Sequence, residues 1–172
     1  MSNLAPYGWI ESTLGDLLKN IEGGGTPTRG VSEYWNGEIP WATVKDLTGT
    51  WLNSTQESIT EAGVESSSTK LIPPKTMIVA TRMAVGKAVC FDREVAINQD
   101  LKAFFPKDYV QSDFLLQWYQ FHSETIENLG TGSTVKGIGL DDIKPMPVVL
   151  PPLPEQQKIA TILSSVDDVI EK

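Results

Sequence analysis

Near the end of the chain, hydrophobic positions recur with the period of a helix. Apolar residues follow one another at spacings of four, three and four: Ile159, Leu163, Val166 and Ile170. This spacing is typical of an amphipathic helix or of a coiled-coil seam. Pro154 suits the first turn because its missing N–H is not needed there, and Glu155 is favoured by the helix dipole. We therefore expect a domain over residues 1–153 and a dimerisation or spacer helix over residues 154–172.

The helical seam leaves two structures open. Two heptads are too few to distinguish a helix that folds back on its own domain from a helix that pairs with a second one. An exposed helix of this length would be marginally stable in water, so its apolar face must be covered by some surface.

Upstream, a second helical pattern and several short apolar runs are present. Ser112 can start a helix whose apolar positions continue to Leu129, and Gly130 stops it. A turn at Asn36-Gly37 leads into a strand that reaches Trp41. The last strand, Ile143–Leu150, contains two prolines and is therefore expected at a sheet edge.

Short strands with scattered helices are typical of an α+β fold and not of a βαβ array. We expect small mixed, mostly antiparallel sheets with one long helix packed on them, followed by the C-terminal coiled-coil-type helix. The chain of 172 residues is long enough for one domain with a hydrophobic core.

Charge and composition argue against several classes of protein. Fourteen Lys and Arg against 22 Asp and Glu give a net charge of −8, the wrong sign for non-specific binding to DNA. No run of about 18 apolar residues and no signal-like leader is found, so neither a membrane span nor secretion is expected. The lone Cys90 fits a buried thiol in a reducing cytoplasm.

Catalysis has little support in the sequence. With one cysteine and one histidine, His122, the chain offers neither a zinc site of those ligands nor a Cys/His pair. It lacks the G-x-S-x-G motif of many hydrolases. The Asn-Pro-Pro-aromatic signature of amino-methyltransferases and the glycine motif for their cofactor are also missing. Any methylation chemistry would belong to another chain.

A set of polar residues near predicted strand ends and loops is suited to contacting nucleic acid and not to catalysis. Arg and Lys can contact guanine edges or phosphates, Asn and Gln can pair with adenine, and Ser and Thr let phosphates approach closely. The candidates are Arg29, Lys45, Arg82, Asn98, Gln99, Ser133, Thr134 and Lys136. Each also has a plainer interpretation, because Asn98-Gln99 could close a turn and residues 132–134 could form a linker.

Seven motifs in order give the chain a family resemblance. They are Leu14-Gly15-Asp16 after Trp9, Gly25-Thr26-Pro27, Tyr34 to Trp41, Asp46-Leu47, Thr81-Arg82 with Gly86, Asn98-Gln99 with Gly132-Ser133-Thr134, and Pro151 to Gln156. In this order the chain resembles a target recognition domain of a type I restriction–modification specificity subunit, in half-length form. The family's threonine before Asn-Gln is Ile97 here.

The resemblance implies a non-catalytic chain that recognises one half of a bipartite double-stranded DNA target. It also implies docking to modification subunits, which carry S-adenosylmethionine, and to restriction subunits, which use ATP and Mg²⁺. No cofactor is expected on this chain, and the terminal seam could pair two copies as a homodimer. The alternative is a protein-interaction module that pairs with specificity or modification subunits without contacting DNA.

Overall fold

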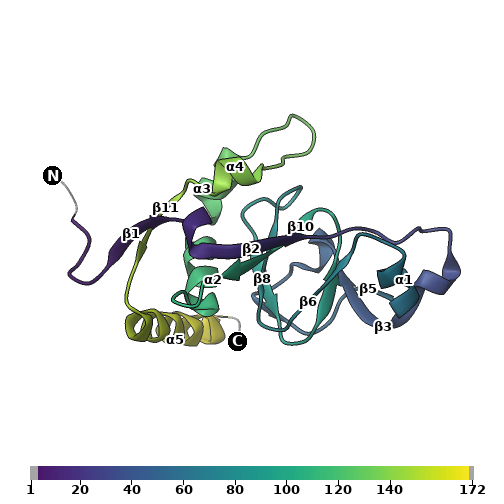
Figure 1. Ribbon diagram of the computed structural model, residues 1–172, viewed down its shortest axis with the longest axis horizontal. Helices are drawn as coiled ribbons and strands as arrows, with labels where there is room; N and C mark the ends of the chain where they lie inside the picture. The colour runs from purple at the N-terminus through teal and green to yellow at the C-terminus, as the bar shows by residue number, and fades with distance from the viewer. Residues whose placement is uncertain (1–3, 171–172) are drawn as a thin grey trace.

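The computed structural model describes residues 4–170 and has three sheets flanked by helices (Figure 1). The strand order in the largest sheet is β2-β10-β7-β8-β4, and in the second it is β5-β3-β9-β6. The first sheet contains β2 (Leu18–Gly23), β4 (Trp51–Leu52), β7 (Met77–Ala80), β8 (Ala88–Phe91) and β10 (Leu101–Pro106). The second contains β3 (Trp35–Ala42), β5 (Glu57–Ile59), β6 (Lys70–Ile72) and β9 (Val95–Ile97). The third pairs β1 (Ile10–Thr13) with β11 (Pro147–Leu150).

Helices and short 3-10 turns connect these strands. The α-helices are α1 (Glu61–Glu65), α2 (Ser112–Phe121), α3 (Ser123–Leu129), α4 (Leu140–Ile143) and α5 (Leu153–Ile170). The 3-10 turns are η1 (Gly15–Leu17), η2 (Ser32–Tyr34) and η3 (Val44–Asp46). All named strand pairs are antiparallel except β3 with β9 and β4 with β8. The α+β class and the mostly antiparallel sheets are thus confirmed.

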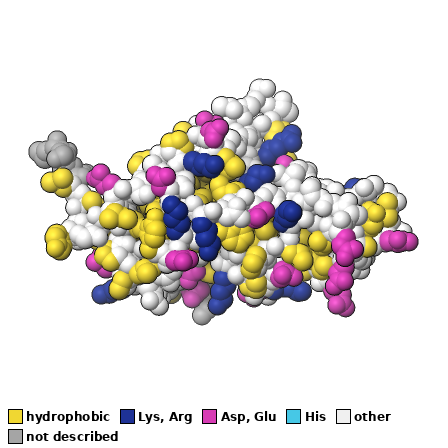
Figure 2. Space-filling model, in the orientation of Figure 1, with side chains coloured by type: hydrophobic (Ala, Val, Ile, Leu, Met, Phe, Trp, Pro, Cys, Tyr) yellow, Lys and Arg dark blue, Asp and Glu magenta, His cyan; other side chains and the backbone are white. Residues whose placement is uncertain are grey.

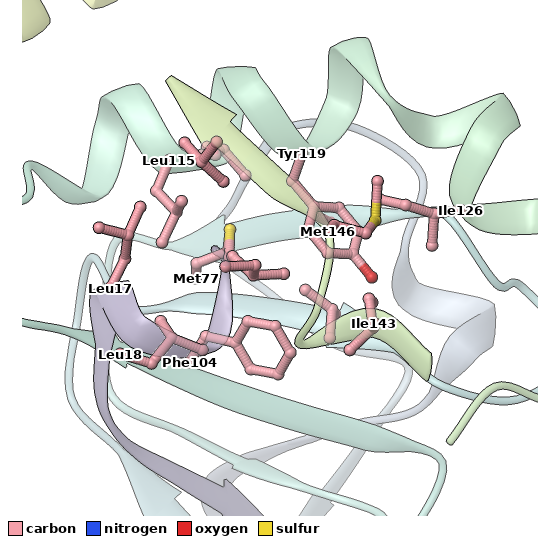
Figure 3. Close-up of a cluster of buried hydrophobic side chains, with 14 of the residues drawn as sticks. Leu17, Leu18, Met77, Phe104, Leu115, Tyr119, Ile126, Ile143 and Met146 are labelled. Atoms are coloured by element: carbon pink, nitrogen blue, oxygen red, sulfur yellow. The ribbon is translucent and has the colours of Figure 1, made fainter. Parts of the chain in front are cut away.

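Two apolar layers hold the domain together. The five-stranded sheet packs one face against α2, α3 and α4, where Phe104, Tyr119 and Ile126 are fully buried (Figure 3). Its other face packs on the second sheet through Phe91, Ile97 and other side chains. Burial of these side chains contributes the main stabilisation of the domain.

The prediction of one long helix over residues 112–129 is wrong in one respect, because this segment forms two helices. His122, with φ −94° and ψ 14°, separates α2 from α3. Its ring Nδ1 lies 2.8 Å from the carbonyl oxygen of Trp118, to which its backbone N–H also donates. The change of direction places Ile126 in the same buried layer as α2 (Figure 3).

Two other local predictions need correction. Residues 143–146 are not part of the last strand, because Ile143 ends α4 and Met146 N–H donates to its carbonyl in a turn. Asn36 and Gly37 lie inside β3, where Asn36 has φ 61° and the register shifts, so they form an irregularity and not a chain reversal. A Cβ at Gly37 would collide with the carbonyl of Ile59, which explains the glycine.

The terminal helix packs on its own domain along α2. Gln156 and Ala160 are buried, and Gln117 Nε2 donates to Asp167 across the two helices at 3.1 Å. The predicted helix is present through Ile170, and its last two positions lie outside the described residues. In the described part of the chain, none of the helices has the length and apolarity needed to cross a membrane.

Candidate nucleic-acid interface

Backbone hydrogen bonds gather several loops at one end of the two large sheets. Asn98 N–H donates to Ala42 O at 3.0 Å, and Thr81 N–H donates to Asp100 O at 2.9 Å. Ile138 N–H in turn donates to Thr81 O at 2.9 Å. These bonds bring the ends of β3, β7 and β9 next to the segment that follows α3. Most of the polar residues predicted from the sequence lie in these loops.

Arg82 lies at the centre of the gathered loops. It follows β7 and forms an isolated antiparallel bridge with Gly137. Its side chain is 60% exposed, and Nη1 lies 4.0 Å from the Oδ1 of Asp100, which is buried. The guanidinium is thus oriented by one carboxylate but open to solvent, as a group that contacts phosphate or guanine must be.

Asn98 and Gln99 have opposite environments. Asn98 is only 5% exposed, and its Oδ1 accepts from the backbone N–H of Asp100 at 3.0 Å. Its side chain closes the turn between β9 and β10, so little of Asn98 is exposed in this conformation. Gln99 is exposed, and its Oε1 accepts from Thr26 Oγ1 at 2.6 Å, which leaves its amide N–H groups free to face outward.

The small-residue loop after α3 is a closed hairpin. Thr131 and Gly137 exchange two backbone hydrogen bonds of 2.8 and 2.9 Å. Ser133 and Thr134 are exposed at its tip, and Lys136 Nζ lies 4.0 Å from Glu127. The loop therefore presents hydroxyl groups and one cation beside Arg82.

Arg29 pairs with one acidic and two aromatic side chains of its own domain. Its guanidinium pairs with Glu57 and stacks over Trp35 and Trp41, with distances of 4.1 and 5.1 Å to the ring centroids. The hydrogen bond to Glu57 is the main cause of its raised pKa, and the same bond lowers the pKa of Glu57. Arg29 thus has contacts within the domain while 56% of its side chain stays exposed.

The two tryptophans hold the glycine-rich loop after β2. Trp41 Nε1 donates to Gly25 O at 3.0 Å, and Trp35 Nε1 donates to Thr28 O at 3.1 Å. Together with Thr26 and Gln99 they fix this loop beside the turn at Asn98. The sequence did not predict this role, because no local pattern pairs an indole N–H with a loop carbonyl.

Lys45 lies near the same end on η3. Thr43 and Asp46 form a capping box that orders this turn, and Lys45 itself is exposed. It borders a hollow of about 340 Å³ that Trp51 also lines. Lys45, one of the candidates named from the sequence, is thus exposed and available to a ligand.

Further basic side chains lie on one flank of the domain. Figure 2 shows Lys and Arg gathered over β2, α4 and the base of the loop between α3 and α4, with Asp and Glu interspersed. Lys19 and Lys144 share a hollow of about 360 Å³, and Lys19 lies 3.6 Å from Asp108. The strand pairing that brings these lysines together is non-local, so no sequence pattern indicated it.

Other reactive groups in the domain are buried. Burial, followed by the charge of Asp113, raises the pKa of the Cys90 thiol to about 12. Burial also raises the pKa of Tyr119, whose hydroxyl has no hydrogen-bond partner within the described residues. Across residues 4–170, no group of three or more His, Cys, Asp or Glu side chains is placed to hold a metal ion.

The predicted helix seam is mostly exposed. Ile159 is partly buried against the core, whereas Leu163, Val166 and Ile170 are 40, 49 and 75% exposed. Ile162 and Val169 extend this apolar surface. The contact of α5 with the domain uses a neighbouring face, which is anchored by Gln156. Its Oε1 accepts from Gln111 N–H at 2.7 Å, and its Nε2 donates to Pro151 O at 2.8 Å.

Comparison with known proteins gives one family. The family model described as type I restriction modification DNA specificity domain matches residues 6–172. The chain is 32% identical to the MjaIX specificity subunit of Methanocaldococcus jannaschii, with 96% of this chain and 39% of that protein covered. It is also 32% identical to the EcoR124I/EcoR124II specificity subunit of Escherichia coli, with 90% and 40% covered.

Solved structures share the fold. The HsdS subunit from Thermoanaerobacter tengcongensis superposes with a TM-score of 0.76 at 21% identity, over 99% of this chain and 40% of that one. The S subunit from M. genitalium gives 0.66 at 19% identity, over 99% and 41%. The chain thus spans about 40% of the length of the relatives that it matches.

Proposed function

Because this chain belongs to the type I restriction modification DNA specificity domain family, we propose that it recognises one half of a bipartite double-stranded DNA target. The family match over residues 6–172 carries this proposal. The gathered loops support it, because they present cations, amides and hydroxyls at one end of a rigid sheet core. These are the groups that contact phosphates and base edges.

Within this interface the residues have distinct roles. Arg82 and Gln99 are the proposed readers of base edges, and Ser133, Thr134 and Lys136 contact the phosphate backbone. Lys45 adds a cation at the margin of the interface. Asn98 and Arg29 act indirectly, since Asn98 shapes the turn that carries Gln99 and Arg29 orders the glycine-rich loop.

The chain works with partners and supplies no catalytic group of its own in this proposal. It docks on modification subunits that hold S-adenosylmethionine and on restriction subunits that use ATP and Mg²⁺. Such a complex acts on DNA in the cytoplasm. The exposed seam of α5 serves to pair the chain with another helix, for which a second copy is the proposed partner.

The test is DNA binding with and without the modification subunit. The methylated sequence would first be identified in the source cell, and fluorescence anisotropy would then measure affinity for that duplex. A net charge of −8 opposes counterion release, so the isolated chain should bind at micromolar affinity or weaker. Adding the modification subunit should strengthen binding greatly. Tight specific binding by the isolated chain would contradict this dependence.

A protein-interaction module without DNA recognition is the competing function, and the acidic surface is the observation that favours it. It predicts a stable complex with the modification subunit whose DNA preference does not change when Arg82 or Gln99 is substituted. A mobility shift of target and scrambled duplexes by wild-type and variant complexes separates the two functions.

A further inference from the structure

The loop between β7 and β8 places a long apolar side chain at an unusual backbone angle. Met83 has φ 64°. Among the non-glycine residues at 4–170, only Asn36 and Lys75 also have a positive φ. Asn tolerates this region well, whereas a residue with an unbranched apolar chain is strained there. Strained backbone persists only where the surrounding structure enforces it, and it is concentrated at ligand-binding sites.

The surrounding structure does enforce this conformation. Met83 N–H donates to Lys136 O at 2.8 Å, which ties the loop to the hairpin of residues 131–137. Ala84 N–H donates to Arg82 O at 2.7 Å and closes the loop from within. The bridge between Arg82 and Gly137 adds a third connection. The position of Met83 is therefore set by the same contacts that set Arg82.

Core packing does not explain the side chain. Met83 is 53% exposed and belongs to none of the three buried clusters. It follows the exposed Arg82, and the hairpin to which its N–H is bonded presents Ser133, Thr134 and the partly exposed Val135. An apolar side chain is thus exposed next to Arg82 in this loop, although a glycine would fit the backbone without strain.

We propose that Met83 is a specificity-determining residue that contacts the 5-methyl group of a thymine, beside the base pair contacted by Arg82. This inference rests on the proposed DNA-binding function. Met83 directly follows Arg82 in one tied loop, so in this proposal both side chains meet the same groove. An arginine finds its bidentate guanine partners, O6 and N7, in the major groove. The apolar group that base pairs present in that groove is the thymine methyl.

The experiment removes the methyl group and the side chain in turn. Purified chain with its modification subunit would select its target from a pool of random duplexes. Each thymine of the target would then be replaced by deoxyuridine, which differs only in lacking the methyl. Burial of one methyl group corresponds to roughly a four-fold change in affinity. We expect about that loss at one position for the wild type and for Met83→Leu, and no loss for Met83→Gly.

Met83→Gly is the informative variant because glycine adopts positive φ freely and preserves the loop. A target without thymine, no deoxyuridine-sensitive position, or a sensitivity that survives Met83→Gly would overturn the assignment. The assignment would also be overturned if Met83→Gly lowered the affinity by the same factor whichever base of the target is changed. That result is expected of an apolar wedge between base steps. In these cases wild-type target binding persists and the proposed function stands, whereas absence of any selected target contradicts both.

Discussion

At the residue scale, burial distinguishes two neighbours that the sequence treats alike. Asn98 and Gln99 are both amides in one motif, yet Asn98 is buried in the turn and Gln99 is exposed. The difference arises because the Asn side chain is short enough to accept from the backbone two residues ahead. Its longer neighbour reaches out to Thr26.

Alanine substitution of each amide should separate stability from binding. Asn98→Ala removes a buried hydrogen bond and should lower the free energy of unfolding by about 1–3 kcal/mol. Gln99→Ala should change stability by less than about 0.5 kcal/mol but weaken target binding by about 1–3 kcal/mol. Thermal melts and anisotropy on both variants check this. Equal loss of stability in the two variants would assign Gln99 a structural role.

The Arg29–Glu57 pair predicts a dependence on pH. The hydrogen bond from Arg29 lowers the pKa of Glu57 in the folded state. The pair therefore stabilises the fold above the ordinary glutamate pKa, and this contribution is lost as pH falls through the lowered value. Because both side chains are partly exposed, its size should stay within about 1 kcal/mol.

Denaturant titrations of wild type, Glu57→Gln, Arg29→Gln and the double variant at several pH values measure this contribution. The difference between wild type and Glu57→Gln should shrink toward acid. In the Arg29→Gln background, Glu57→Gln should add little change at any pH. A difference that grows on acidification would show that the assigned sign is wrong.

At the element scale, local patterns predicted most segments but not how they end or pair. The helical periods of α2, α3 and α5 were correct, because amphipathic spacing is written into consecutive residues. The break at His122, whose ring Nδ1 also lies against the Trp118 carbonyl, has no clear sequence signal. The convergence of the loops at Ala42, Thr81 and Asp100 depends on non-local pairing and could not be predicted.

Gln156 shows how one polar residue fixes an element. It is the most buried polar residue of the described chain, and it bonds to the backbone of three residues outside α5, namely Tyr109, Gln111 and Pro151. These bonds hold the start of the helix on the segment before α2. The family motif included Gln156, but only the structure reveals this anchoring role.

Gln156→Ala should loosen α5 from the domain. Unsatisfied buried backbone groups cost about 1–3 kcal/mol, so the free energy of unfolding should fall by that amount. Hydrogen exchange should rise in α5 and at residues 109–111. The matched control is Gln157→Ala, since Gln157 is the exposed neighbour and its side chain makes no bond across the interface. Similar effects of both variants would mean that helix propensity, and not anchoring, is responsible.

At the scale of the whole molecule, charge and shape divide the surface between two tasks. Cations and amides are exposed at the gathered loops, and Figure 2 shows Lys and Arg with interspersed Asp and Glu along one flank of a chain whose net charge is −8. The apolar surface of α5 lies elsewhere and faces solvent. We propose that the gathered loops face DNA and that the seam of α5 faces a protein partner.

We predict that the seam of α5 pairs two copies of the chain. Leu163, Val166 and Ile170 would become buried in that pairing, and burying apolar surface at ~25 cal/mol per Å² favours association. Two-fold symmetry would place two identical recognition domains on a palindromic, spaced site. The helix itself stays docked, since its contact with the domain uses Gln156 and Ala160 instead.

Sedimentation of the wild-type chain should therefore give a dimer, and Leu163→Glu combined with Ile170→Glu should give a folded monomer. The control is Thr161→Glu combined with Ser165→Glu, which adds the same charge to exposed polar positions of the same helix. That control should remain dimeric. A wild-type chain that sediments as a monomer at tens of micromolar would end the self-pairing hypothesis, because an interface able to align two recognition domains on one DNA must hold at lower concentrations. The seam would then be assigned to a helix of a different chain.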